Sequence, residues 1–325
     1  METRSPSPNQ ALGTSSMAAL LPDVLAKATQ HICVCICTYK RPRFLQRLLR
    51  NLADQETRGC FTYSIVVADN DHSRSAEALV KDFAAASTIP VKYCVEPQQN
   101  IGMTRNKAIQ EASGDFIAFI DDDEFPTKRW LFILFEACNK FNADGVLGPV
   151  KPYFEEKAPK WVVRGKFYER PTYSTGFVID WRKGRTGNVL LRKLIFEGLE
   201  QPFNPKFHVA EDQDFFRRMI AKGYTFIWCN EAVAFEVVPP VRWRRTFMLK
   251  RALLRGTYCV QHPVSHSRAI ARSMVAIPIY AAALPLTLAL GHHRFMTLLV
   301  KLFDHLGRLL AFVGLMPVRN QYVTD

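Results

Sequence analysis

The sequence lacks both of the glycine-rich motifs that bind phosphate through backbone amides. No GxxxxGK followed by Ser or Thr occurs, and no GxGxxG follows the first apolar run, residues 31–37. Backbone N–H groups are therefore not arranged to surround a phosphate in either of these ways. A divalent ion bound to carboxylates is the alternative means of neutralising a diphosphate.

Cysteine spacing typical of metal sites is absent as well. There are 8 cysteines, but no two of them are spaced as CxxC. Cys33, Cys35 and Cys37 alternate along one predicted strand, so they share a face and cannot easily form disulfides with one another. We interpret the cysteines as small buried hydrophobic residues in a reducing compartment, which predicts the cytosol.

Acidic residues are missing from a long stretch near the C-terminus, between Glu236 and Asp304. The formal net charge of +13 is therefore concentrated in the C-terminal third. No basic run is interleaved with aromatic residues in a known nucleic-acid motif, so we predict no nucleic-acid partner. A basic segment leading into an apolar one favours an anionic membrane surface, and a solvated basic helix is the structural alternative.

The N-terminus has no long apolar stretch after a basic start. Residues 1–30 are rich in Ser, Pro and Ala, which predicts a flexible leader and not a signal peptide. The rest of the 325 residues, with 48% hydrophobic residues overall, suffices for one large α/β domain plus an appendage.

What the sequence does contain is a series of apolar strands separated by helical patterns. The predicted strands are residues 31–37, 63–68, 91–95 and 115–120. This alternation predicts right-handed crossovers and a mostly parallel sheet, in which ligands bind beyond the carboxyl ends of the strands. The polar residues just past those ends are Thr38, Asp69 and Asp121 to Asp123.

Four consecutive acids, Asp121 to Glu124, follow the last of these strands. They repel one another unless a cation lies among them, and hard oxygen ligands select Mg²⁺ or Mn²⁺. Such an ion would stabilise a diphosphate as a leaving group. A solvated acidic turn is the structural alternative.

A second acidic group, Glu211 and Asp212 with Asp214, opens a predicted helix. Acids are favourable there because of the helix dipole, so capping is one explanation. The other is a general base that deprotonates an acceptor hydroxyl. Position alone does not separate the two.

Together these residues resemble family 2 of the inverting glycosyltransferases, most closely the bacterial exopolysaccharide and cell-surface polysaccharide branch of the succinoglycan type. The resemblance covers residues 32–243. It implies a GT-A fold, which is Rossmann-like with a mostly parallel sheet and flanking helices. It also implies a hexosyltransferase that uses a nucleotide-diphosphate sugar, for which we expect UDP, with Mg²⁺ or Mn²⁺ and a glycan or lipid-linked acceptor.

The donor-side residues are assigned by this resemblance. The segment 37–42 resembles the family's first loop, from which Thr38, Tyr39 and Arg41 would approach the nucleotide. Asp69 matches the acid that reads the base, and Arg105, within 100–106, matches an arginine near the nucleotide.

The acidic run resembles the family's DxD motif, formed by Asp121 and Asp123. Asp123 is the better candidate for direct metal ligation, while Asp121 and Asp122 would position the nucleotide. Many relatives carry a His as a possible further metal ligand where this chain has Glu236, which would either ligate the metal or have no such role. The predicted metal set is thus Asp123, Asp121 and Glu236.

The acceptor side is assigned in the same way. Gly187 and Asn188 resemble the acceptor-side segment, and Glu211-Asp212 resembles the pair whose Asp is the base, with Glu211 as its orienting partner. Arg242 and Trp243, also placed on the acceptor side, resemble the QxxRW motif of processive synthases. Pro239 stands where Gln would be, which predicts addition of a single sugar.

The C-terminal region has two apolar parts. Between Arg272 and Arg294 lie 21 uncharged residues, interrupted by Pro278 and Pro285, which are just long enough to span a bilayer. In residues 295–315 the polar side chains recur on one helical face, which predicts an amphipathic helix lying at an interface; they are Lys301, Asp304, His305 and Arg308. We therefore expect the protein at the cytoplasmic face of the cell membrane, with a soluble helical lid as the alternative.

The predicted organisation is a leader (1–30), a nucleotide-sugar-binding half (31–150), an acceptor and catalytic half (151–243) and a membrane-associating segment (244–325). A nucleotidyltransferase on a similar fold would need a Gly-rich basic loop after the first strand, and a haloacid-type phosphatase would need DxDx followed by Thr or Val; neither pattern is present. A catalytically silent, membrane-bound adaptor with the GT-A fold would be expected to lose Asp123 or Asp212, and both are retained.

Overall fold

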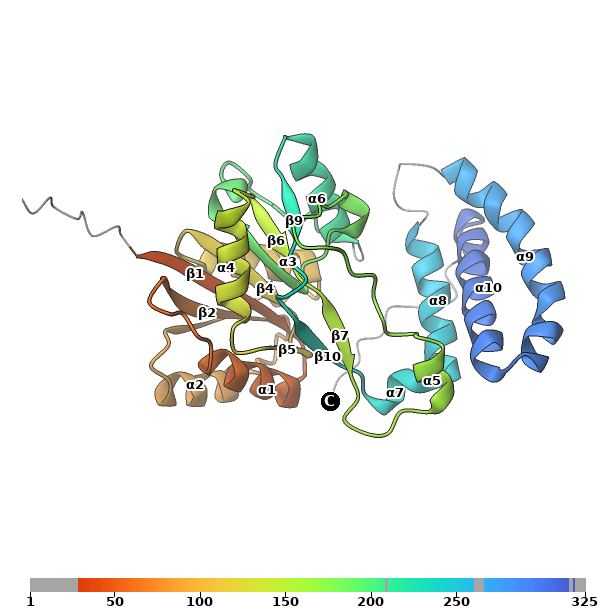
Figure 1. Ribbon diagram of the computed structural model, residues 1–325, viewed down its shortest axis with the longest axis horizontal. Helices are drawn as coiled ribbons and strands as arrows, with labels where there is room; N and C mark the ends of the chain where they lie inside the picture. The colour runs from red at the N-terminus through yellow and green to blue at the C-terminus, as the bar shows by residue number, and fades with distance from the viewer. Residues whose placement is uncertain (1–28, 208–209, 260–265, 316–317, 319–325) are drawn as a thin grey trace, which may run out of the picture.

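The computed structural model describes residues 29–207, 210–259, 266–315 and 318. Of the predicted leader, residues 1–28 lie outside the described residues. The described chain forms an α/β part with a layer of C-terminal helices beside it (Figure 1).

A central sheet of seven strands has the order β3-β2-β1-β4-β8-β6-β9. β1 is parallel to β2 and β4, whereas β8 is antiparallel to both of its neighbours. The prediction of a mostly parallel sheet is confirmed. The strands are β1 (Gln30–Thr38), β2 (Phe61–Asp69), β3 (Val91–Val95), β4 (Phe116–Ile120), β6 (Gly145–Leu147), β8 (Asn188–Arg192) and β9 (Phe226–Trp228).

Helices cover both faces of this sheet because side chains alternate along β1. Ile32, Val34 and Ile36 pack with α1 (Pro42–Ala53), α2 (Glu77–Ala86) and α4 (Trp130–Lys140). Cys33 and Cys35 point to the other core, formed with α3 (Ile101–Glu111) and α6 (Glu211–Ala221). Both cysteines are fully buried and free, as the alternation predicts.

After β4 the chain passes through Asp121 to Asp123 into a small second sheet. Its order is β5-β10-β7, with β5 (Glu124–Pro126) antiparallel and β7 (Val150–Tyr153) parallel to β10 (Ala234–Val237). Glu124 and Glu236 are register partners, so this sheet brings two acids together that are far apart in the sequence. The short helices beyond it are α5 (Lys160–Arg164) and α7 (Pro240–Trp243), with 3₁₀ turns at Trp181–Lys183 and Lys193–Phe196.

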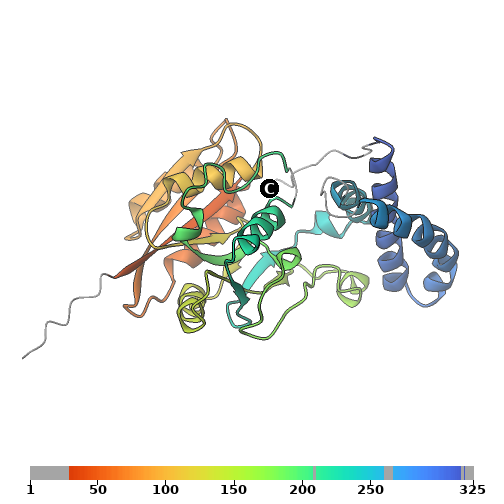
Figure 2. The ribbon, with the colours of Figure 1, turned by 90° about the horizontal axis from the view of Figure 1, so that it is seen from above.

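Three C-terminal helices form the layer beside the α/β part: α8 (Arg245–Cys259), α9 (His266–Ala289) and α10 (His292–Phe312) (Figure 2). The α8 and α10 backbones touch, because a Cβ added at Gly256 would lie 2.2 Å from the Asp304 carbonyl oxygen. A Cβ at Gly307 would lie equally close, 2.2 Å, to the Leu253 carbonyl oxygen. Glycine is therefore required on both helices at this crossing.

Part of the predicted interfacial face of α10 is turned toward the neighbouring helices. Asp304 pairs with Arg255 of α8, and buried His305 lies 2.9 Å from the Ser273 hydroxyl of α9. These two side chains thus join α10 to its neighbours, whereas Lys301 is exposed.

The exposed apolar surface belongs to α9. Its window Arg268–Ala289 has a mean hydropathy of 1.6, and it is the one helix in the described ranges that is long and apolar enough to cross a membrane. Both prolines lie within a continuous helix. The large side chains that α9 exposes include Met274, Val275, Ile279, Leu286 and Leu288.

Candidate active site

Strand ends bring the predicted donor-side residues to one edge of the sheet. Thr38 at the end of β1 and Asp69 at the end of β2 are register partners, and Asp121 directly follows β4. The Thr38 hydroxyl donates to Asp122 Oδ2 at 2.9 Å. The expected gathering of polar groups at this edge is confirmed.

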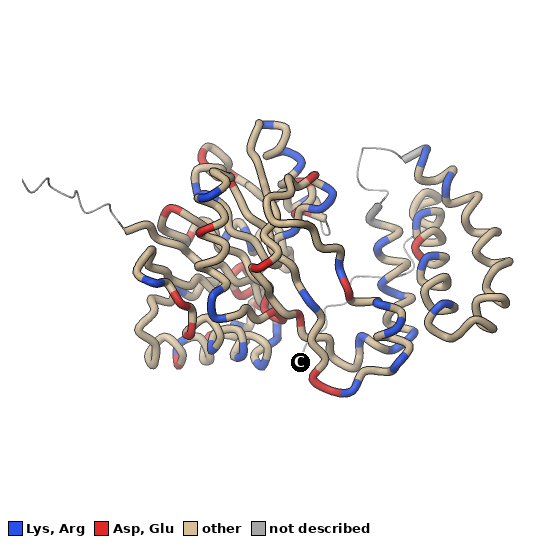
Figure 3. Tube along the Cα trace, viewed as in Figure 1, with Lys and Arg blue, Asp and Glu red and all other residues tan. Residues whose placement is uncertain are grey.

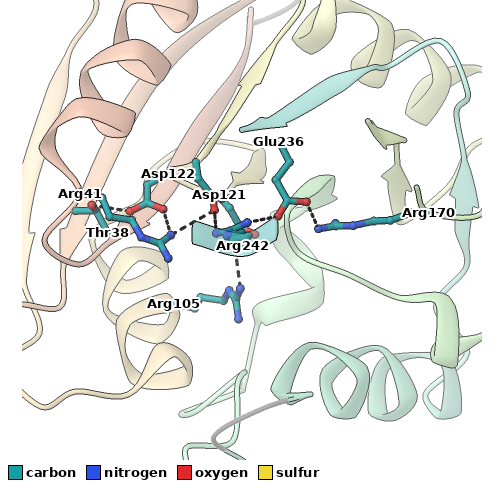
Figure 4. A network of polar contacts seen from close by, with 9 residues as sticks. Thr38, Arg41, Arg105, Asp121, Asp122, Arg170, Glu236 and Arg242 are labelled. Atoms are coloured by element: carbon teal, nitrogen blue, oxygen red, sulfur yellow. Dashed lines mark hydrogen bonds and ion pairs between the residues drawn. The ribbon is translucent and has the colours of Figure 1, made fainter. Parts of the chain in front are cut away.

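Arginines compensate the charge of the acidic run. Arg41 Nη1 lies 2.8 Å from Asp122 Oδ1 and 3.5 Å from Asp123 Oδ2, and Arg242 Nη2 lies 2.6 Å from Asp123 Oδ2 (Figure 4). Arg105 Nη2 lies 3.7 Å from Asp121 Oδ1. Guanidinium groups therefore supply opposite charge to Asp122 and Asp123, so repulsion at these two acids does not by itself require a metal ion.

Burial and arginine pairing act oppositely on these carboxyl groups. Burial raises the pKa of Asp122 to about 6 even though Arg41 and Thr38 favour the ionised form. At Asp123 burial works in the same direction, but Arg242 and Arg41 outweigh it and hold the pKa below its ordinary value. Asp123 is thus ionised and already paired.

Asp121 is the member of the acidic run that is open to a ligand. Its side chain is 43% exposed, compared with 5% for Asp122 and 8% for Asp123. Glu236, the third predicted metal ligand, is held by Arg242 at 2.8 Å and by Arg170 at 2.5 Å. Arg242 thus bridges two of the three predicted ligands, and within the described ranges no group of three His, Cys, Asp or Glu side chains is arranged to hold a metal.

Glu124 belongs to the predicted acidic run but not to the predicted metal set of Asp121, Asp123 and Glu236. It is 1% exposed, and neither of its carboxylate oxygens has a hydrogen-bond partner among the described residues. Burial raises its pKa well above the ordinary value. A Cβ on Gly187 would lie 2.8 Å from Glu124 Oε1 and 3.0 Å from Asp121 Oδ2, so both carboxylates converge on this glycine. Hard, unpartnered oxygens beside an accessible carboxylate fit a divalent ion. The signal was the period of two within β5, which turns Glu124 and Pro126 inward.

The second acidic group is joined to the first by Arg105 of α3. Arg105 Nη1 contacts Glu211 Oε1 while its other nitrogen faces Asp121. Burial and the neighbouring Glu211 raise the pKa of Asp212 to about 6. Asp214 instead pairs with Arg217 and Arg218 of its own helix at 2.8 Å. Stabilisation of the helix is therefore a sufficient explanation for Asp214, though not for Glu211 and Asp212.

Several predicted ligand residues are occupied by the protein itself. The Asn188 side chain is buried and bonds Trp130 Nε1 and the carbonyls of Pro149 and Ala232, which leaves it no group for an acceptor. Trp243 is buried in a cluster with Val162 and Val238. These two residues hold the scaffold together.

Asp69 is likewise engaged. Its carboxylate is fully buried and accepts from the backbone N–H groups of Asp71 and Ala76 and from the Tyr93 hydroxyl. Tyr39 lies beside the loop lysine, with Lys40 Nζ 5.2 Å from its ring centroid. Base reading by Asp69 stays a prediction.

A mostly parallel sheet with carboxylates and arginines beyond the ends of β1 and β4 is the arrangement of a nucleotide-dependent α/β enzyme. The model of the family described as glycosyl transferase family 2 matches residues 33–196. The chain is 35% identical over 231 residues to the succinoglycan biosynthesis protein ExoM of Rhizobium meliloti, covering 70% of this chain and 74% of that protein. The chain belongs to glycosyltransferase family 2.

Solved structures show the fold. The mannosyltransferase PcManGT from Pyrobaculum calidifontis, in complex with GDP-Man and Mn²⁺, matches with a TM-score of 0.60 at 16% identity, over 89% of this chain and 88% of that one. Residues 1–349 of S. aureus TarS with UDP-GlcNAc match with a TM-score of 0.51 at 16% identity, over 73% and 68% of the two chains. The chain has the GT-A fold.

Proposed function

We propose that this glycosyltransferase transfers one sugar, with inversion, from a UDP-linked donor to a glycan or lipid-linked acceptor in cell-surface polysaccharide synthesis. The observation that carries the proposal is the position of Arg105, which contacts the donor-side Asp121 and the base-side Glu211. The similarity to a succinoglycan biosynthesis protein supports the polysaccharide setting. The complexes of the structural neighbours with GDP-Man and UDP-GlcNAc support a nucleotide-sugar donor.

On the donor side, Asp121 and Glu124 would hold Mg²⁺ or Mn²⁺ against Gly187. Asp123 and Glu236, the other predicted ligands, would become available only if Arg242 released them. When bound, the ion would neutralise charge on the leaving diphosphate. Arg41 and Arg105 contact the same acidic run and would contribute further positive charge to the nucleotide.

On the acceptor side, Asp212 would take the proton of the attacking hydroxyl. A pKa of about 6 keeps it ionised at pH 7 yet more basic than an ordinary aspartate. Glu211, fixed by Arg105, would orient it. Asp212 makes no ion pair with a described residue and accepts one hydrogen bond, from the Gln213 N–H, so its second oxygen is available to the acceptor hydroxyl.

The test is sugar transfer by Asp212→Asn, measured with a panel of nucleotide sugars with Mn²⁺ and with EDTA. We expect transfer to fall by about 100-fold or more while donor binding stays within about twofold. Asp180→Asn is the matched control: Asp180 is the N-cap of the 3₁₀ turn Trp181–Lys183, its side chain is 42% exposed, and asparagine caps equally well, so this variant should be as active as the wild type. Undiminished transfer by Asp212→Asn would refute the base assignment.

The same assay addresses the silent-adaptor alternative. An adaptor would bind a nucleotide sugar without turning it over, whatever acceptor or metal is supplied. Turnover by the wild type with one donor of the panel would exclude it, and donor binding without any turnover would favour it.

We also propose that α9 attaches the protein to the cytoplasmic face of the membrane through its exposed apolar side chains. Ile279 and Leu286 are 58% and 65% exposed, so replacing both by Glu should preserve the fold. The double variant should lose flotation with anionic vesicles, because two charges would enter the apolar layer. Leu194→Glu, exposed on a 3₁₀ turn of the α/β part, is the control and should float normally. Equal flotation of all variants would contradict attachment through α9.

A further inference from the structure

A cavity of about 170 Å³ lies between the active site and the C-terminal helices. The α/β part contributes Tyr168, Arg170 and Glu236 to its lining. On the helical side, α8 contributes Arg251 and Arg255, and α10 contributes Val300. The cavity thus shares Glu236 and Arg170 with the active site and is bounded by α8 and α10, which pack beside α9 with its exposed apolar side chains.

The face of α8 that lines this cavity is determined by helical spacing. Met248, Arg251 and Arg255 are three and four residues apart and therefore lie on one face. The close crossing of Gly256 and Gly307 brings α10 against this end of α8. The arginines are thereby held beside Val300, in a place that combines positive charge with apolar surface.

The acids that line the cavity already have cationic partners. Glu236 is held by Arg170 and Arg242, and Glu169, also on the wall, lies 3.3 Å from Lys166. Both carboxylates are thus already engaged by other cations, and Glu236 acts on Arg251 only through its charge, without a direct contact.

The two α8 arginines that line the cavity differ in their anionic partners. Arg255 pairs with Asp304 at 3.1 Å, whereas Arg251 has no ion pair or hydrogen bond with any residue that the structure describes. Desolvation by the cavity walls and the nearby Arg242 lower the pKa of Arg251 more than Glu236 and Tyr168 raise it, so the charge of Arg251 is only partly compensated. Figure 3 shows the excess of positive charge on the C-terminal helices, which carry several Lys and Arg positions (blue) and little Asp or Glu (red).

We propose that this cavity binds the phosphate or diphosphate ester that links the acceptor to an apolar carrier, with Arg251 as its principal ligand. The proposal rests on the proposed transferase function, which supplies the acceptor. Arg251 would donate N–H groups to the phosphate oxygens, the apolar chain would leave along α9 and α10, and the sugar end would face Asp212. Arginine suits this role because its planar fork of donors matches phosphate oxygens.

The experiment uses the full chain in detergent with UDP and Mg²⁺ present to occupy the donor site. The probe is farnesyl diphosphate, which carries a diphosphate on an apolar chain, and its binding is followed by calorimetry. Arg251→Gln should weaken this binding by about tenfold or more. Lys250→Gln removes the same charge from the neighbouring, exposed position of α8 that does not line the cavity, and should change binding by less than about twofold.

Two further probes distinguish a phosphate ester on an apolar carrier from a free diphosphate. Farnesol lacks the anion and pyrophosphate lacks the chain, so both should bind more weakly than farnesyl diphosphate. Equally tight, Arg251-dependent binding of pyrophosphate would overturn the carrier-linked ligand and point to a free diphosphate. Equal effects of Arg251→Gln and Lys250→Gln would overturn the site altogether, and restored binding by Arg251→Lys would support it.

The outcome is distinguishable from that of the transferase proposal. If the wild type transfers sugar but Arg251→Gln changes neither the acceptor KM nor farnesyl diphosphate binding, the cavity proposal fails alone. If no donor is turned over but binding still depends on Arg251, the transferase proposal fails and the anion site stands. Donor hydrolysis without acceptor should be unchanged in Arg251→Gln, because this residue lies outside the donor site.

Discussion

The active site and α8 are both rich in arginine, but the two sets of guanidinium groups are in opposite situations. In the site, Arg105 and Arg242 are buried, and each contacts two carboxylates. On α8, Arg251 is exposed and unpaired within the described residues, and the sequence from 237 to 303 offers it no acid. The first set stabilises a preformed site and the second is available to a ligand.

This contrast also predicts different effects for substitutions of arginine in the active site and on α8. A buried ion pair that loses one partner leaves an uncompensated charge in a medium of low polarity, whereas an exposed pair is screened by water. Substitutions in the site should therefore act on stability, and substitutions on α8 should act on binding.

The largest effect is expected for Arg242→Met, which keeps the volume but removes the charge between Asp123 and Glu236. The variant should lose about 3 kcal/mol of unfolding free energy, because both carboxylates stay buried and only Arg41 and Arg170 remain to pair with them. Urea unfolding in EDTA measures this loss.

Mn²⁺ sharpens the Arg242 test. If the released carboxylates bind the ion, adding Mn²⁺ should restore part of the lost stability. Arg74→Met is the control, because Arg74 is 60% exposed and its pair with Glu77 is long, at 3.6 Å, so its loss should cost less than about 1 kcal/mol. A cost at Arg242 no larger than at Arg74 would erase the contrast between buried and exposed arginines.

The next largest effect is a gain in the free energy of unfolding, and it is expected on substitution of Glu124. Its folded-state pKa is raised, so its contribution to stability is present below its unfolded pKa and lost as pH rises through the folded value. Glu124→Gln should therefore be more stable than the wild type by about 1–3 kcal/mol at pH 8 in EDTA, with the difference vanishing near pH 4. Thermal unfolding at several pH values checks this.

Addition of metal then tests whether the buried Glu124 carboxylate is a metal ligand. Mn²⁺ should stabilise the wild type and have a smaller effect on Glu124→Gln if Glu124 is a ligand. The same stabilisation of both proteins would exclude Glu124 from the metal site.

Much of the fold could be predicted from the sequence because it depends on local periodicity. The strand at 91–95 is found with the predicted bounds, and the strand predicted at 115–120 spans Phe116–Ile120. The edge that carries Thr38 and Asp121 follows from the same pattern, since parallel strands end together.

What could not be predicted are the partners that tertiary structure supplies. No local signal indicates that Arg242 lies between Asp123 and Glu236, that the Asn188 amide oxygen accepts from Trp130, or that His305 of α10 is turned inward. Each depends on segments far apart in the sequence. Helical periodicity identifies a polar face but not whether water or another helix covers it.

A smaller effect concerns the pH dependence of transfer. Because burial and Glu211 raise the pKa of Asp212 to about 6, the base is lost as pH falls through that value. The wild type should show kcat/KM falling about tenfold per pH unit below about pH 6, and the residual rate of Asp212→Asn should lack this limb. A profile without an inflection between pH 5 and 7 would contradict the assignment.

The smallest effect is expected for the exposed pair that joins α8 to α10. Arg255 is 51% exposed and lies 3.1 Å from Asp304, so solvent screens the pair and both side chains lose freedom in forming it. A double-mutant cycle of Arg255→Gln and Asp304→Asn, followed by urea unfolding, should give a coupling energy below about 1 kcal/mol. Salt at high concentration should reduce it further, since exposed charges are screened. A coupling as large as the loss at Arg242 would mean that α8 is fixed by its charges in the way the active site is, and its arginines would then be structural and not available to a ligand.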